Sequence, residues 1–171
     1  MAELLSQERL QPSLLDRLTD DDPTSKTESS DKRVLNKQQL KQGVLRDLQW
    51  LLNASRPSPK TFAKYPYVQK SVLNYGLPAL AGETADSIGQ ADLQEAVKDA
   101  IRWFEPRIDA DTLDIRAVSG RSYLDAHNVL ELQVRGTVWA QPTPLELILR
   151  TSMDLETGQV AVREVAGSGR R

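Results

Sequence analysis

The stretch DLQEAVKDAIRWFEPRIDADTLDIRAV, residues 92–118, decides the fold because its hydrophobic period changes partway through. Over residues 92–104 the apolar side chains recur at the spacing of one helix face, made of Leu93, Val97, Ala100, Ile101 and Phe104. From Leu113 onward apolar and polar residues alternate, which is the pattern of a half-buried strand. The stretch therefore predicts a helix that leads directly into a sheet.

Both ends of this helix carry signals. Asp92 is placed to cap the start, and Glu95 follows three residues later, as in a capping box. Pro106 disfavours helical backbone at Glu105, because the proline ring clashes with the preceding residue. We expect the helix to stop at Glu105.

Upstream, residues 36–53 predict a second amphipathic helix, with an apolar stripe of Leu40, Val44, Leu48, Leu51 and Leu52. Asn36 and Gln39 have the spacing of a weak capping box, and Asn53 is expected at the end. Gly43 lowers helix propensity and allows close packing. Residues 12–18 predict a further helix, too short to be stable without something to dock on.

Downstream, the alternation continues in residues 128–140, 145–153 and 159–165, with a turn over 156–158. Together with residues 112–118, these segments predict an antiparallel meander of three to four strands. Gly136, inside the second of them, indicates a bulge or a close backbone approach. The predicted fold class is α+β, with N-terminal helices packed on one face of this small sheet.

The chain has 171 residues, which suits one domain with one hydrophobic core. We expect that domain over residues 34–166. Residues 1–33 are predicted to hold the short helix and a flexible polar linker, and residues 167–171 a loose tail.

Composition excludes several classes of function. There is no cysteine, so disulfides, thiolate zinc sites, iron–sulfur clusters and cysteine nucleophiles are absent. The net charge of −2 provides no basic field for nucleic acid. No window approaches the length of a membrane span, and the N-terminus does not look like a secretory signal. We expect a cytoplasmic protein that neither binds nucleic acid nor inserts into a membrane.

The single histidine, His127, is the weakest of the catalytic candidates. A triad would need it beside Asp125 and either Ser119 or Ser122, all in one polar connection between strands, and no nucleophile elbow accompanies them. One histidine with scattered carboxylates does not make a metal site either. We therefore expect no cofactor and no metal.

Glu105 admits two interpretations. Next to an apolar pair, its pKa would rise, and with Asp109 or Asp111 it would resemble the carboxylate pair of a glycosidase. Alternatively, Arg107 forms an ion pair with it, which favours the charged form and opposes a general-acid role. The second interpretation is preferred, with Glu105, Pro106 and Arg107 forming a protein-recognition corner rather than a catalytic site.

Two residues on the predicted outer face of the sheet also suggest a partner. Arg135 and Trp139 share that face, and both residue types are enriched at interaction hot spots. Plain solvent exposure is the default interpretation. The open edges of a short meander are a second possible contact, because another chain can add a strand there.

The motif WFEPRI, residues 103–108, resembles that of TssE, the family of small baseplate subunits of type VI secretion systems. The family is similar to the small wedge protein of contractile phage tails, which carries a Glu-Pro-Arg motif after a helix. Further matching blocks are LLDRL at 14–18, DLQWLLN at 47–53, SVLNYGLPALAG at 71–82 and LELQVRG at 130–136. Ala54 stands where a threonine is expected, and residues 119–127 match no block.

The resemblance implies a structural, non-enzymatic role in the baseplate. It implies partners TssF, TssG and TssK, and a sheet that helps to start the contractile sheath of TssB and TssC. It also implies that Glu105, Pro106 and Arg107 contact these partners. The alternatives are a lysozyme-like peptidoglycan hydrolase, a label that phage relatives have carried, or a tail-assembly adaptor of a phage-derived injection device.

Overall fold

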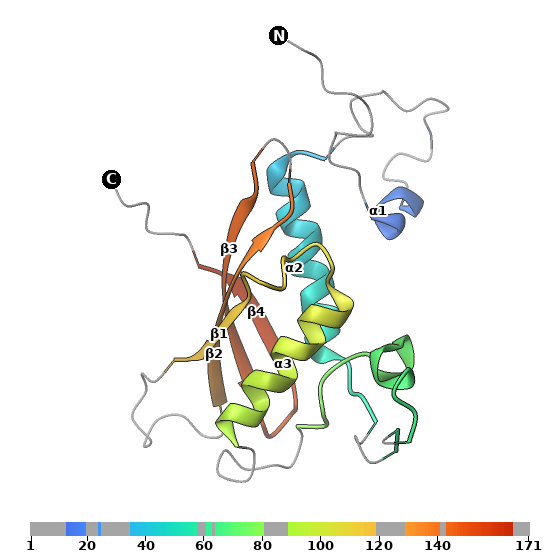
Figure 1. Cartoon of the computed structure of the whole chain (residues 1–171). Helices are drawn as coiled ribbons and strands as arrows, with labels where there is room; N and C mark the ends of the chain where they lie inside the picture. The colour runs from blue at the N-terminus through green and yellow to red at the C-terminus, as the bar shows by residue number, and fades with distance from the viewer. Residues whose placement is uncertain are drawn as a thin grey trace.

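A computed structural model describes residues 13–19, 24, 35–57, 61–62, 64–80, 89–118, 129–140 and 143–165. Figure 1 shows two long helices packed against one side of an antiparallel sheet. The predicted α+β class is therefore confirmed. The residues of the rejected triad, including His127, lie outside the described ranges, as does most of the predicted linker.

The sheet is a four-stranded meander in the order β1-β2-β3-β4. Its strands are β1 (Asp114–Ala117), β2 (Val129–Val138), β3 (Leu145–Asp154) and β4 (Val160–Glu164). The two central strands pair without interruption from Val129 opposite Asp154 to Val138 opposite Leu145. An unbroken register of this length holds one face of the sheet toward the core.

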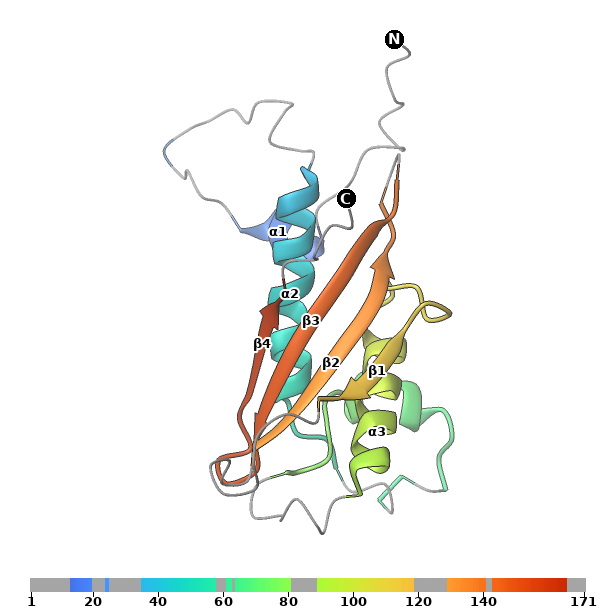
Figure 2. The same cartoon turned by 90° about the vertical axis from the view of Figure 1, so that its left-hand side faces the viewer.

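The helices cover that inner face. α2 (Lys37–Asn53) packs on β4, and α3 (Gln90–Phe104) packs on β1. The apolar stripes predicted for both helices are buried in the core, except that Phe104 is only partly buried. In Figure 2 the sheet faces the viewer and both long helices lie behind it, so its outer face is left uncovered by them.

The ends of the two long helices match the predictions with one exception. Asn36 caps α2 in a capping box, since its side chain accepts from the Gln39 N–H and the Gln39 side chain accepts from the Asn36 N–H. The cap predicted at Asp92 is wrong. Helix α3 begins two residues earlier, after Gly89, so Asp92 lies in the first turn. Its negative charge there interacts favourably with the helix dipole, but its side chain does not cap the helix.

Gly136 is explained by close packing and not by a bulge, since the register of β2 is regular. A Cβ atom added to Gly136 would lie 3.0 Å from Ile108 Cγ2 and 3.7 Å from Leu113 Cδ1. The glycine therefore lets the chain that follows α3 lie directly on β2. This contact fixes the segment that contains the Glu-Pro-Arg motif.

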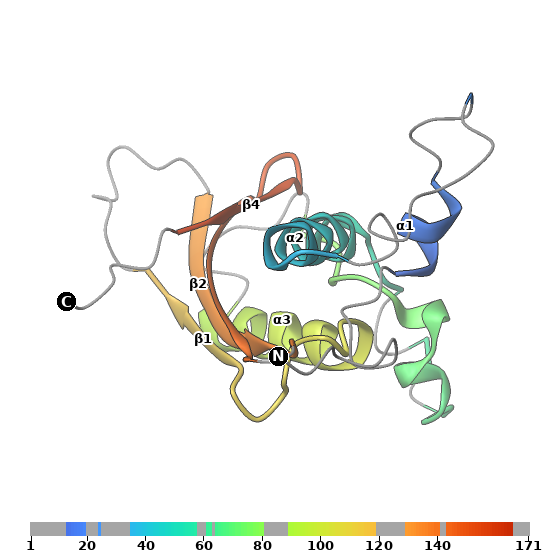
Figure 3. The same cartoon turned by 90° about the horizontal axis from the view of Figure 1, so that it is seen from above.

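The remaining helical elements lie on the far side of α2 and α3 from the sheet, as Figure 3 shows. They are α1 (Leu14–Leu18) and two 3₁₀ turns, η2 (Val68–Lys70) and η3 (Val72–Asn74). The short helix α1 docks as predicted, but through polar contacts, because its three leucines are exposed. None of the described helices has the length and apolar character needed to cross a bilayer.

Candidate functional site

Glu105 lies at the end of α3 and is buried. Its backbone N–H closes the last turn on the Ile101 carbonyl, after which the backbone leaves helical geometry at φ −124° and ψ 74°. The residue is only 3% exposed. A charged carboxylate at this depth needs hydrogen-bond partners, because burying an unpaired charge is costly.

Arg107 provides those partners. Its Nε donates to Glu105 Oε1 at 2.7 Å and its Nη2 donates to Oε2 at 2.5 Å, which is a bidentate pair. The Arg107 backbone N–H adds a bond to Oε1 at 3.2 Å. Burial alone would lower the Arg107 pKa, but the carboxylates of Glu105 and Asp47 outweigh it and raise that pKa. The guanidinium is therefore held in its charged form.

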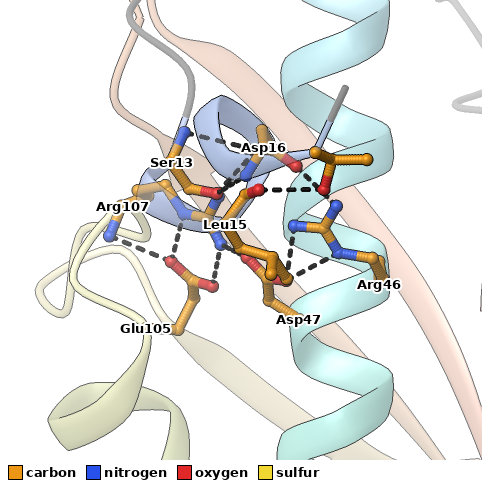
Figure 4. Close-up of polar contacts among 8 residues, drawn as sticks. Ser13, Leu15, Asp16, Arg46, Asp47, Glu105 and Arg107 are labelled. Atoms are coloured by element: carbon orange, nitrogen blue, oxygen red, sulfur yellow. Dashed lines mark hydrogen bonds and ion pairs between the residues drawn. The ribbon is translucent and has the colours of Figure 1, made fainter. Parts of the chain in front are cut away.

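The pair belongs to a chain of charges that Figure 4 shows spanning three helices. Arg107 Nη2 also reaches Asp47 Oδ2 on α2 at 2.5 Å, and Asp47 Oδ1 accepts from Arg46 Nε at 2.9 Å. Arg46 Nη1 then reaches Asp16 Oδ1 on α1 at 2.5 Å. We call these five residues the charge chain; its members are Asp16, Arg46, Asp47, Glu105 and Arg107.

The outer members of the charge chain have shifted pKa values as well. The hydrogen bond to Asp16 and the carboxylate of Asp47 raise the pKa of Arg46 against the opposing effect of burial. Burial would raise the pKa of Asp16, but donors from Arg46 and Ser13 outweigh it and lower that pKa. Arg46 also stacks over the ring of Trp50 at 5.2 Å, a cation–π contact.

Backbone bonds tie the corner to the end of β2. The Trp139 N–H donates to the Arg107 carbonyl at 2.8 Å, and the Asp109 N–H donates to the Thr137 carbonyl at 2.8 Å. Between them, Ile108 forms an antiparallel bridge with Val138. The Glu-Pro-Arg segment is thus fixed by helix, sheet and side-chain contacts at once.

Of the five predicted site residues, Glu105 and Arg107 are paired directly. The sheet brings Trp139 to the corner through its backbone, and its side chain is 61% exposed. Pro106 is exposed directly at the corner. Arg135 is exposed farther along β2, opposite Asp114, with no described contact to the corner.

The carboxylates once considered for a glycosidase pair differ in environment. Both oxygens of Glu105 accept hydrogen bonds from Arg107. Asp109 and Asp111 lie in the following turn, where both are exposed and Asp109 Oδ1 accepts from the Asp111 N–H. The arrangement is typical of a structural ion pair, because a general acid needs an oxygen that can reach substrate.

Sequence reasoning missed three members of the charge chain, which are Asp16, Arg46 and Asp47. Asp47 is separated from Arg107 by 60 residues, and Asp16 from Arg46 by 30. Asp16 and Asp47 do lie in LLDRL and DLQWLLN, two of the blocks that carried the resemblance. The presence of an aspartate in each of these two blocks was the signal that could have pointed to Asp16 and Asp47.

Comparison with known protein families identifies one family. The profile of the family described as baseplate wedge protein gp25 matches residues 38–143, which is more than half of the chain and includes the corner. The chain belongs to this wedge family. TssE belongs to the same family, so the resemblance inferred from the motif is confirmed. No curated protein and no solved structure matches the chain.

Membership in the wedge family gives the chain a structural role in a baseplate of the phage-tail type. It also implies contact with other baseplate components.

Proposed function

We propose that the chain is a structural, non-enzymatic baseplate subunit of a type VI secretion system in the cytoplasm. In this proposal it assembles with TssF, TssG and TssK and helps to start the sheath of TssB and TssC. The Glu105-Pro106-Arg107 corner is its docking point. Arg135 and Trp139 extend the contact along the outer face of the sheet.

One observation supports the docking role most strongly. The Arg107 side chain is 26% exposed, and its Nε and Nη2 are engaged by Glu105 and Asp47. Its Nη1 has no acceptor among the described residues and lies near Gly43 of α2, while Pro106 is exposed at the corner. A guanidinium fixed from behind loses little further conformational entropy when it binds a carboxylate or carbonyl of a partner.

Co-purification tests this proposal. The chain is co-expressed with TssF, TssG and TssK, and Glu105→Ala and Arg107→Ala are each expected to abolish recovery of the complex. Arg116→Ala is the matched control, because the Arg116 side chain is 72% exposed and pairs only locally, with Asp114. Circular dichroism confirms that each variant is folded. Intact complexes with both corner variants would remove the corner from assembly.

A peptidoglycan hydrolase is the competing function, and the pairing of both Glu105 oxygens with Arg107 argues against it. Incubation of the purified chain with peptidoglycan should release no fragments above the level of Glu105→Gln. Release that depends on Glu105 would establish the enzyme instead. A phage-derived device is distinguished by genomic neighbours, since capsid genes rather than sheath and unfoldase genes would surround it.

A further inference from the structure

A short segment before α3 exposes an unusual amount of apolar surface. Residues 64–73 contain the two 3₁₀ turns η2 and η3. Four large side chains point to solvent, with exposed fractions of 60% for Tyr65, 92% for Tyr67, 81% for Val72 and 63% for Leu73. Exposed large apolar residues gathered in one place mark interaction sites, whereas single ones need no explanation.

The backbone of this segment is held by successive hydrogen bonds, so the exposure does not come from a loosely bonded loop. The Val68 N–H donates to the Tyr65 carbonyl at 3.0 Å, and the Ser71 N–H donates to the Val68 carbonyl at 3.0 Å. The Asn74 side chain is buried beneath the turns and donates to the Gln69 carbonyl at 2.8 Å. A prefolded surface avoids much of the ordering cost of binding.

The segment is also anchored to the core at its far end. Leu77 and the chain around Ala54 exchange backbone bonds, since the Leu77 N–H donates to the Ala54 carbonyl at 2.8 Å. Tyr75 packs edge-on against Phe104 with ring centroids 5.3 Å apart. Phe104 directly precedes Glu105, so this ring contact links the chain that follows the segment to the end of α3.

The sequence around this segment is basic. Between Asp47 and Glu83 the sequence contains no acidic residue, and its basic residues are Arg56, Lys60, Lys64 and Lys70. Lys64 and Lys70 are exposed on the same segment as the apolar side chains. Arg56 Nε is buried with no acceptor among the described residues. Lys64 and Lys70 therefore give residues 64–73 a positive charge, in a chain whose net charge is −2.

We infer that residues 64–73 bind an acidic, amphipathic segment of another baseplate protein. Its apolar side chains would cover Tyr67 and Val72, and its carboxylates would meet Lys64 and Lys70. This inference rests on the proposed baseplate function and adds a second contact to the corner. A two-fold contact between copies is disfavoured, because it places the same patch, with its lysines, on both sides.

Site-specific photo-crosslinking tests the inference directly. A benzophenone amino acid replaces Tyr67 in the full chain, which is co-expressed with TssF and TssG, and the cross-linked peptide is sequenced. The expected cross-link falls in a partner segment with apolar residues flanked by aspartate or glutamate. A cross-link to a basic segment, to a second copy, or to nothing within an intact complex overturns the inference.

Affinity measurements with paired variants separate the apolar and charged parts. Tyr67→Ser with Val72→Ser should weaken binding to the TssF–TssG pair at least about tenfold, as expected for a hot spot. Lys64→Glu with Lys70→Glu should weaken it similarly and reduce its dependence on salt. The controls are Lys98→Glu on α3 and Val165→Ser after β4, which alter exposed residues outside the proposed docking residues. Wild-type affinity in both paired variants overturns the inference.

Two further outcomes are distinguishable. If the wild-type chain forms no complex with TssF and TssG, the proposed function fails and this inference fails with it. If the complex forms with wild-type affinity in both paired variants, only the inference fails.

A membrane is the remaining alternative, and vesicles of phosphatidylcholine with phosphatidylserine test it. Binding of the chain to these vesicles that requires Tyr67 and Lys64 would assign the surface to a membrane and overturn a protein partner.

Discussion

Arg107 joins the end of α3 to the middle of α2, because its Nη2 donates to Asp47 Oδ2 at 2.5 Å across 60 residues of sequence. The same guanidinium donates hydrogen bonds to both carboxylate oxygens of Glu105. A single arginine therefore neutralises a buried carboxylate and ties two helices together. The corner is a structural brace as well as a proposed docking point, and mutations there must be judged for both effects.

Removing Arg107 should destabilise the fold. Arg107→Ala leaves the Glu105 carboxylate, whose side chain is 4% exposed, without its bidentate partner, and we expect the free energy of unfolding to fall by about 3–5 kcal/mol. Urea unfolding at neutral pH measures this. Arg116→Ala breaks an exposed pair and should cost less than about 1 kcal/mol. Equal small losses in the two variants would show that the brace contributes little.

Two glycine substitutions should act in opposite directions. At Gly76 the backbone φ is +111°, and an added Cβ would lie 2.2 Å from the Ala54 carbonyl oxygen. Backbone strain alone should therefore make Gly76→Ala lower the free energy of unfolding by about 1–3 kcal/mol, and the clash with Ala54 should add to this loss. Gly43 is helical, and its Cβ would meet Asp16 and Arg107 at 3.7 and 3.8 Å, which is ordinary contact.

Gly43→Ala is thus the matched control, and it should raise stability by about 0.5–1 kcal/mol through helix propensity. Thermal unfolding of both variants provides the comparison. If the Gly43→Ala variant is instead less stable than the wild type, the added methyl group disturbs the charge chain, and this prediction is wrong.

Asn53 acts as a substitute strand partner for the first residue of β4. Its Oδ1 accepts from the Val160 N–H at 2.9 Å and its Nδ2 donates to the Val160 carbonyl at 2.8 Å. Asn53→Ala should cost about 1–3 kcal/mol and speed hydrogen exchange at the Val160 amide. Asn53→Asp keeps the acceptor and loses the donor, so its loss of stability should lie between that of the wild type and that of Asn53→Ala. Unchanged exchange in the alanine variant would contradict this role.

Docking of α1 should depend on pH and should be lost at acidic pH. The pKa of Asp16 is lowered from its ordinary value of 3.8, so its pairing stabilises the docked helix above that pH and is lost as the pH falls through the lower folded pKa. Amide resonances of residues 14–18 should therefore shift toward free-chain values only below pH 3.8. Asp16→Asn should show the released spectrum at neutral pH. A docked spectrum in that variant would assign the docking to other contacts.

Local patterns in the sequence predicted most of the fold. The change of period after Phe104, the alternation in β2 and β3, and the Asn36 cap each depend on neighbours within a few residues. The start of α3 was misplaced by two residues because Gly89 precedes it without any side-chain cap. Helix ends depend on weak competing signals and are the least determined by sequence.

The candidate site was predictable only in part. Glu105 and Arg107 are two residues apart, so their pairing could be expected, and the structure brings them together. Asp47 and Asp16 reach the corner only because α2 and α1 pack beside it. Packing of this kind depends on tertiary contacts that no local spacing encodes.

The central claim is that partner proteins dock at the Glu105-Pro106-Arg107 corner, and Pro106→Glu tests it most directly. Pro106 is exposed and takes no part in the charge chain, so its replacement should cost at most about 1 kcal/mol of stability. The measurement is the affinity of the folded variant for the TssF–TssG pair. We predict at least a tenfold loss, about 1.4 kcal/mol. Wild-type affinity in a folded Pro106→Glu chain would contradict the claim.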